Sequence, residues 1–338
     1  MATQSYTLHS SHSETSGPSS SLAADVAKDE SFNSIKRIYA AFIENLEYSP
    51  EGPISDNNET YQALLTEFAA YNTGGKWFQA LCQESSTLAE VRVSLNCDLQ
   101  MYLIYVDDLG QKFPLFLEGF QERVLTGKNP EGPFLNDYRA HLADMYHLWD
   151  TLPANFITLS GMDFINGCVL EQTPAIRDMR LSQAAHWWPY YLRNKTGSAT
   201  AYAYMLFPKE IHIDMSIYIQ VIEDIIFYIN LTNDILSPSS RLNSHYDEYH
   251  RFYKEDLAGE RNNYIYNRAH VTQKSALDAL QDTINEIMDA HARITEVLKD
   301  TAAYVPWRIF VNGYIAFHHT LKRYHLEDLG FKIVSEIL

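Results

Sequence analysis

The chain has 338 residues, of which 46% are hydrophobic and 13% aromatic, enough for one large domain or two small ones. Its 26 Lys and Arg against 43 Asp and Glu give a net charge of −17, which excludes a general attraction to nucleic acid or to an anionic membrane. An anionic substrate would therefore need local cations or a metal at its binding site.

The N-terminal segment, residues 1–27, is rich in Ser, Thr, His and Ala, and this composition predicts a disordered tail. Residues 28–338 carry the apolar patterning of one domain, which no linker divides. The N-terminal segment lacks the basic-then-apolar pattern of a secretory signal peptide, and no apolar run approaches the roughly 20 residues that span a bilayer. Three cysteines without paired spacing indicate neither disulfides nor a zinc site. We therefore expect a cytoplasmic protein without a membrane span.

Helical spacing of apolar residues dominates the chain from residue 31 onward. A long helix is predicted over residues 86–108, where Thr87 and Glu90 match a capping box. Convincing alternating strands are absent, so we predict an all-α fold. The other segments with helical spacing are 136–152, 154–172, 179–193, 212–237, 273–299 and 304–324.

The helix over 86–108 ends in two adjacent carboxylates, Asp107 and Asp108. Such a pair at the end of an apolar helix is costly unless it is solvated, ion-paired or bound to a metal. Carboxylate oxygens suit Mg²⁺, which is usually bound by one or two carboxylates together with substrate phosphates. The structural alternative is an acidic helix end at the surface.

A second set of oxygen donors occurs in "NDILS", where Asn233 and Ser237 share one helix face. Their amide and hydroxyl oxygens could complete the shell of a hard cation. A carboxylate four residues further on would be the natural third ligand, but that position holds Arg241. The next candidate is Glu255, in "FYKE". The structural alternative is that Ser237 simply ends a helix before Pro238.

Three further side chains could bind phosphate oxygens. Arg193 stands just before a glycine-containing break in "WWPYYLRNKTG". Arg323 and Tyr324 end the aromatic-rich segment "GYIAFHHTLKRY". Together with the acidic and amide oxygens, these residues suggest a cavity in an all-α fold that would bind a diphosphate through metal ions and cationic side chains. Aromatic rings in that cavity would stabilise carbocations.

These motifs resemble the trichodiene synthase family of fungal class I terpene cyclases. The likeness covers roughly residues 85–330 and rests on stretches in the family's order: "DDLGQ", "SGMDFINGCVLEQ", "LFPKE", the split "NDILS…FYKE", "EDLAGERNNYI" and "GYIAFHHTLKRY". The resemblance implies a helical bundle around an aromatic-lined cavity. It also implies ionisation of farnesyl diphosphate triggered by three Mg²⁺ ions, and it is compatible with a homodimer.

The resemblance assigns roles residue by residue. The implied Mg²⁺ ligands are Asp107, Asp108, Asn233, Ser237 and Glu255. The implied diphosphate contacts are Arg193, Lys254, Arg323 and Tyr324, with Asp107, Arg323 and Tyr324 as catalytic residues. The candidate cavity aromatics are Tyr314, Phe317, Trp187 and Tyr102.

Two departures from the family pattern stand out. Gln111 occupies the place of a third acid in the Asp-rich motif, which predicts a weakened metal response. Residues 238–251 interrupt the second motif; without them Asn233, Ser237 and Glu255 would fall at i, i+4 and i+8. The insertion is either an error of the gene model, such as a retained intron, or a genuine loop that returns "FYKE" to the site.

The predicted function is that of a sesquiterpene synthase, which converts farnesyl diphosphate to a cyclic C15 hydrocarbon or alcohol and releases diphosphate. The altered motif favours a product other than trichodiene, with trichodiene itself as an alternative. A non-catalytic protein that binds isoprenoid diphosphate or a protein partner is the alternative of another class. A chain-elongating prenyltransferase would need two Asp-rich motifs, and the sequence has one.

Overall fold

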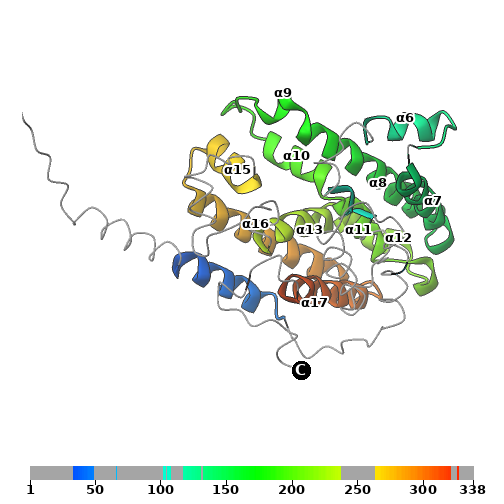
Figure 1. Ribbon diagram of the computed structural model, residues 1–338. Coiled ribbons are helices and arrows are strands. Elements are labelled where there is room, and N and C mark those ends of the chain that lie inside the picture. The colour runs from blue at the N-terminus through cyan, green and yellow to red at the C-terminus, as the bar shows by residue number, and fades with distance from the viewer. Residues whose placement is uncertain are drawn as a thin grey trace, which may run out of the picture.

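The computed structural model describes residues 33–48, 66, 102–103, 105–107, 117–130, 132–236, 263–320 and 326. Every regular element within these ranges is a helix, which confirms the predicted all-α class (Figure 1). The elements are α6 (Phe120–Leu125), α7 (Gly132–Leu148), α8 (Thr151–Gln172), α9 (Pro174–Arg177), α10 (Trp188–Thr196), α11 (Ala199–Met205), η2 (Lys209–Ile211), α12 (Met215–Tyr218), η3 (Ile219–Val221), α13 (Ile222–Leu236), α15 (Tyr264–Thr272), α16 (Ala276–Leu298) and α17 (Tyr304–Thr320).

Helices α7 and α8 pack along a stripe of apolar residues. In α7 the buried residues Leu135, Tyr138, Leu142 and Met145 follow one another at three- and four-residue steps. The stripe meets α8 at Gly161, where an added Cβ would lie 2.6 Å from Leu142 and 2.9 Å from the hydroxyl of Tyr138. The same hydroxyl donates to the carbonyl of Gly161 at 2.9 Å. Glycine at this position therefore permits the close approach of the two helices.

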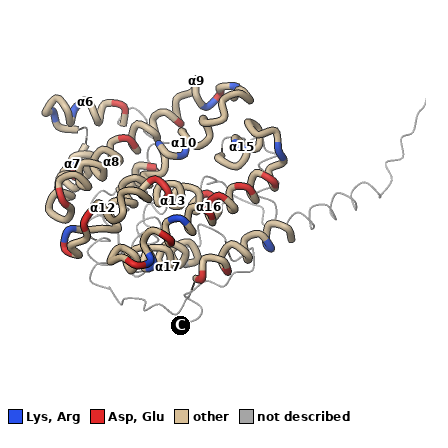
Figure 2. Tube along the Cα trace, turned by 180° about the vertical axis from the view of Figure 1, so that it is seen from behind, with Lys and Arg blue, Asp and Glu red and all other residues tan. Residues whose placement is uncertain are grey.

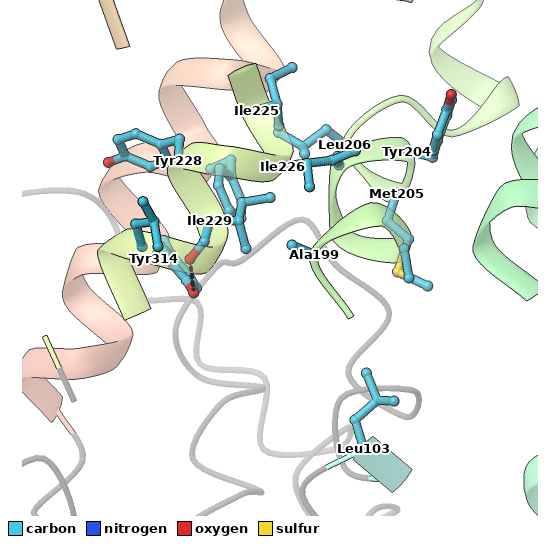
Figure 3. Packing of buried hydrophobic residues seen from close by; sticks show 14 of the residues in the cluster. Leu103, Ala199, Tyr204, Met205, Leu206, Ile225, Ile226, Tyr228, Ile229 and Tyr314 are labelled. Carbon is cyan, nitrogen blue, oxygen red and sulfur yellow. Dashed lines mark hydrogen bonds between the residues drawn. The ribbon is translucent and has the colours of Figure 1, made fainter. Parts of the chain in front are cut away.

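Helix α13 occupies the centre of the bundle, against α11 and α16 (Figure 1). Nine of its 15 residues are buried, as expected of a helix that is surrounded on most sides. Figure 3 shows Leu206 beside Ile225 and Ile226, and Tyr314 of α17 donating to the carbonyl of Ile229 at 3.0 Å. Among the described residues, the stretch Met215–Leu236 is long and apolar enough to cross a membrane, but half of its apolar window is buried inside the bundle.

Helix α16 packs against α13 with one apolar face, which includes Leu280, Ile284, Ile287 and Ile294. Its first turn is capped by Ser275, whose hydroxyl accepts from the backbone N–H of Asp278 at 3.1 Å. Ile284, Ile287 and Ile294 recur at helical spacing, so the sequence pattern of 273–299 correctly indicated this helix.

An N-terminal helix over residues 33–45 joins the bundle through Tyr39 and Phe42, with Leu46 following the last turn. The Tyr39 hydroxyl donates to the carbonyl of Ile235, in the last turn of α13. Tyr39 therefore supports the helix that carries Asn233.

Several helix boundaries differ from the sequence predictions for physical reasons. Residues 136–152 do not form one helix, because the backbone is extended at Asp150 (φ −60°, ψ 156°), where α8 begins. Within 179–193 the α-helix begins only at Trp188, with Pro189 in the first turn, where its missing N–H costs nothing. The segment 212–237 is not one regular α-helix: the helix starts at Met215, where Asp214 caps it through the N–H of Ser216 at 2.8 Å, and the 3-10 turn η3 separates α12 from α13.

Candidate active site

Polar side chains meet where α10 and α13 approach their C-terminal ends. Arg193 donates from Nη2 to Oδ1 of Asn233 at 2.9 Å. Its Nε lies 2.7 Å from Oδ1 of Asp234, an ionic contact without hydrogen-bond alignment. The side chains of Arg193 and Asp234 are only 11% and 20% exposed, so solvent screens their attraction weakly. The fold thus brings together two predicted site residues, Arg193 and Asn233, that lie 40 residues apart.

The carboxyl group of Asp234 sits in an environment that opposes its ionisation. Burial raises its pKa to about 6, and the Arg193 guanidinium counteracts part of that rise. Its Oδ2 atom is buried and has no hydrogen-bond partner among the described residues. Buried carboxylate oxygens are normally satisfied, so this group has spare capacity for a cation or a hydrogen-bond donor.

The break between α10 and α11 sets the position of Arg193. Gly197 follows the last residue of α10, and an added Cβ there would lie 2.0 Å from Oδ1 of Asn230 and 2.5 Å from Nη1 of Arg193. Ser198 then turns the chain through the left-handed region, at φ 48°. Only a residue without a side chain fits between Arg193 and α13, which explains the glycine in "RNKTG".

Two further hydrogen bonds hold this break against its neighbours. The amide of Asn230 in α13 donates to Oδ1 of Asn194 at 3.0 Å. The hydroxyl of Ser160 in α8 accepts from the backbone N–H of Ala201 at 3.1 Å. That N–H belongs to the first turn of α11, where no carbonyl of the same helix can serve it. Helix α13 therefore fixes the end of α10, and α8 fixes the start of α11.

Helix α17 is the third helix that contributes residues to the site, after α10 and α13. Nε2 of His318 lies 3.1 Å from Nδ2 of Asn233, and Nδ1 of His318 lies 2.7 Å from the carbonyl of Tyr314. Tyr314, Phe317 and His318 are all buried. The Tyr314 ring meets the imidazole edge-on with 4.8 Å between centroids, and the Phe317 ring does so at 4.9 Å. The Tyr314 hydroxyl is engaged by the Ile229 carbonyl, so this residue presents its ring rather than a donor.

The remaining predicted residues have different surroundings. Asp107 lies on the helical segment 105–107 and is half-buried. Tyr102 is buried against Tyr138 and Phe134, at ring distances of 5.7 and 5.3 Å, and is a core residue. The expectation for Trp187 is wrong: it is 80% exposed at the N-cap of α10, so it does not line an enclosed cavity.

Six residues of the predicted site lie outside the described residues: Asp108, Ser237, Lys254, Glu255, Arg323 and Tyr324. Gln111 and the insertion 238–251 lie outside them as well. Within the described part of the chain, no three His, Cys, Asp or Glu side chains form a group suited to a metal. The predicted ligands include an amide and a hydroxyl, and three of the five fall outside the described ranges. This search for acidic, His and Cys groups therefore does not test the predicted metal site.

Comparison with known proteins gives consistent matches. The family model described as Trichodiene synthase (TRI5) matches residues 78–334. Terpene synthase BipA of Cochliobolus sativus is 31% identical over 331 residues, covering 90% of this chain and 97% of that protein. Monoterpene synthase 25 of Postia placenta is 32% identical over 243 residues, covering 71% and 68%. Longiborneol synthase CLM1 of Gibberella zeae is 29% identical over 312 residues, covering 88% of each.

The all-α fold and these matches define a terpene cyclase, an enzyme that acts on a prenyl diphosphate. The chain belongs to the trichodiene synthase family, whose model spans most of its length. The family resemblance inferred from "DDLGQ", "NDILS" and "GYIAFHHTLKRY" is therefore confirmed.

Two residues of this site were not predicted from the sequence. Asp234 stands beside Asn233 in "NDILS", and its adjacency to a candidate ligand was the available signal. His318 follows Tyr314 by four residues, so it lies on the same face of an apolar helix. A polar residue on a buried face needs a hydrogen-bond partner, but the sequence does not show that the partner is Asn233.

Proposed function

We propose that this terpene cyclase ionises farnesyl diphosphate with Mg²⁺ and cyclises the C15 chain to a hydrocarbon or alcohol other than trichodiene. The observation that carries the proposal is Arg193, held in a weakly solvated position by Asn233 and Asp234 of the "NDILS" motif. The family model and the longiborneol synthase match support a C15 substrate. Trichodiene remains the alternative product. The homodimer and the cytoplasmic location stay predictions.

The donor atoms around Asn233 suit a hard cation. Its amide oxygen and the unpartnered Oδ2 of Asp234 are oxygen donors of the kind that Mg²⁺ prefers. We assign the bound ions to Asp107, Asp108, Asn233, Ser237 and Glu255. When bound, they would stabilise negative charge as it builds up on the leaving diphosphate.

The chain's own cations would bind the same leaving group. A guanidinium carries five N–H donors, more than Asn233 and Asp234 engage, so Arg193 keeps donors for phosphate oxygens. Its weak exposure strengthens each of these interactions. Lys254, Arg323 and Tyr324 are assigned to the same diphosphate on the family pattern.

Aromatic rings would stabilise the carbocations that follow ionisation. We assign this role to Phe317 and Tyr314, which lie on α17 beside His318. A ring face attracts a cation through its quadrupole, most strongly where water is excluded. Because the hydroxyl of Tyr314 is occupied by Ile229, the ring and not the hydroxyl would carry this effect.

The direct test is gas chromatography with mass spectrometry of the products from purified protein, farnesyl diphosphate and Mg²⁺. We expect a cyclic C15 product that is absent from the Asp107→Ala variant. Geranyl diphosphate should be assayed in parallel, because one relative is named a monoterpene synthase. Turnover of the C10 substrate alone would refute the assignment of a C15 substrate. Product formation that Asp107→Ala leaves unchanged would refute the assigned metal ligand.

A further inference from the structure

A chain of hydrogen bonds crosses three helices at the proposed metal motif. It runs from Arg193 in α10 to Asn233 in α13, at 2.9 Å, and on to His318 in α17, at 3.1 Å. It ends at the backbone carbonyl of Tyr314, 2.7 Å from Nδ1 of His318. His318 is fully buried, so the end of this hydrogen-bond network at α17 is shielded from water.

The two ends of this chain determine the direction of every bond in it. The guanidinium of Arg193 can only donate, so the atom of Asn233 that faces it must be the amide oxygen. The carbonyl of Tyr314 can only accept, so Nδ1 of His318 must carry a proton. The Nε2 atom of the neutral ring is then an acceptor, and it requires the NH₂ group of Asn233.

We propose that His318 is a positioning residue that sets the amide orientation of Asn233. This inference rests on the proposed function, in which Oδ1 of Asn233 is a Mg²⁺ ligand. By accepting from Nδ2, His318 keeps Oδ1 on the side of Arg193, where the diphosphate would bind. An amide rotated by half a turn would present NH₂, which cannot bind a cation.

Loss of the acceptor has a defined consequence. Without Nε2 of His318, Nδ2 of Asn233 loses a buried partner, and of the described residues only Arg193 continues to orient the amide. Groups that orient a metal ligand typically change metal affinity by roughly 10- to 100-fold when they are removed. We therefore expect the Mg²⁺ concentration for half-maximal binding to rise at least about tenfold.

Two substitutions separate the positioning role from simple packing. His318→Gln can place an amide oxygen near the present Nε2 and so still accept from Asn233. His318→Asn is shorter and reaches only the Nδ1 position, so it can bond the Tyr314 carbonyl but not Asn233. A third variant, His319→Leu, changes the neighbouring buried histidine, whose ring lies 5.6 Å from that of Tyr48.

The readout is the Mg²⁺ dependence of thermal stabilisation by inorganic diphosphate, which needs no turnover. We expect His318→Gln and His319→Leu to respond at Mg²⁺ concentrations within about twofold of the parent, and His318→Asn to require about tenfold more. The melting temperature without ligands corrects each variant for its own stability.

Two results would overturn the inference. A normal Mg²⁺ midpoint in His318→Asn would show that the histidine only fills space. An equal rise in the Gln and Asn variants would show that the acceptor near Asn233 is not what matters. If the parent itself showed no Mg²⁺-dependent stabilisation by diphosphate, the proposed metal role of Asn233 would fail first, and the two failures are thereby distinguished.

Discussion

The pair formed by Arg193 and Asp234 is the strongest electrostatic feature among the described site residues. Asp234→Asn keeps the shape of the side chain but removes the charge that holds the guanidinium. Because the pair is weakly solvated, we expect kcat/KM for the prenyl diphosphate to fall at least about tenfold. Diphosphate release under steady-state conditions measures this loss.

A matched control exists on the same helix. Asp224, near the start of α13, forms an ion pair with Arg293 at 2.6 Å, and the Arg293 side chain is 57% exposed. Asp224→Asn should leave kcat/KM within about twofold of the parent, because surface ion pairs contribute little. Equal losses in the two variants would contradict a specific role for Asp234.

A buried histidine away from the site should make folding stability depend on pH. His291 in α16 is 8% exposed, and its ring contacts those of Tyr228 and Trp307. Burial, and then the nearby charge of Arg308, lower its pKa to about 4. Between pH 6.5 and 4 the unfolded chain therefore binds more protons than the folded one, so acidification reduces the free energy of unfolding.

The expected reduction in the free energy of unfolding is about 3 kcal/mol over that interval, because the pKa of His291 falls to about 4 from an ordinary value of about 6.5. Denaturant titrations at pH 7 and pH 4.5 measure it. His291→Phe should weaken the dependence, whereas His147→Phe, at an exposed position of α7, should keep it. The same slope in the parent and in His291→Phe would contradict the assignment to His291.

At the scale of elements, the break between α10 and α11 should tolerate no side chain at Gly197. A Cβ there would press on Asn230 and Arg193, so Gly197→Ala should displace the guanidinium. We expect at least about a tenfold fall in kcat and a loss of stability of roughly 1–3 kcal/mol from overpacking. Gly119→Ala is the control, because its added Cβ meets no atom closer than 3.5 Å. Wild-type kcat in Gly197→Ala would refute the effect.

The helices themselves were largely predictable, whereas their boundaries were not. The apolar spacing of 273–299 closely matched α16, because one face of that helix is buried along its whole length. The spacing of 212–237 hid both the start at Met215 and the 3-10 turn η3, because apolar residues continue through both. The short helices α11 and α15 offered too few turns for a periodic signal.

Site residues were predictable from the sequence only where they belong to a recognisable motif. Arg193 and Asn233 were candidates from their own motifs, the resemblance gave them roles, and the fold places them in contact. Their partners Asp234 and His318 depend on which helix faces meet across α10, α13 and α17, and one sequence does not contain that geometry. Trp187 was misplaced because aromatic character alone does not distinguish a cavity wall from an exposed N-cap.

At the scale of the whole molecule, the charge distribution limits how a prenyl diphosphate can bind. The net charge is −17, and Figure 2 shows acidic positions spread over the described helices, with fewer basic ones. Such a field repels a diphosphate at long range. Under the proposed function, binding would therefore depend on short-range groups such as Arg193 and on Mg²⁺, and not on electrostatic steering.

The insertion 238–251 separates the two halves of the second predicted metal motif, "NDILS" and "FYKE". Its deletion would join Ser237 to Phe252 and place Glu255 four residues after Ser237. If α13 continued as a helix past Leu236, then Asn233, Ser237 and Glu255 would share one face. The present chain has Pro238 at that point, and proline is strongly disfavoured inside a helix.

We therefore expect the deletion variant to turn over farnesyl diphosphate at least about tenfold faster than the parent, with the same requirement for Asp107. A variant in which 14 residues of Gly and Ser replace 238–251 keeps the spacing of the present chain and controls for the lost sequence. It should behave like the parent if spacing alone matters. Loss of activity on deletion would instead show that the insertion is a genuine loop, which returns Lys254 and Glu255 to the site in this chain.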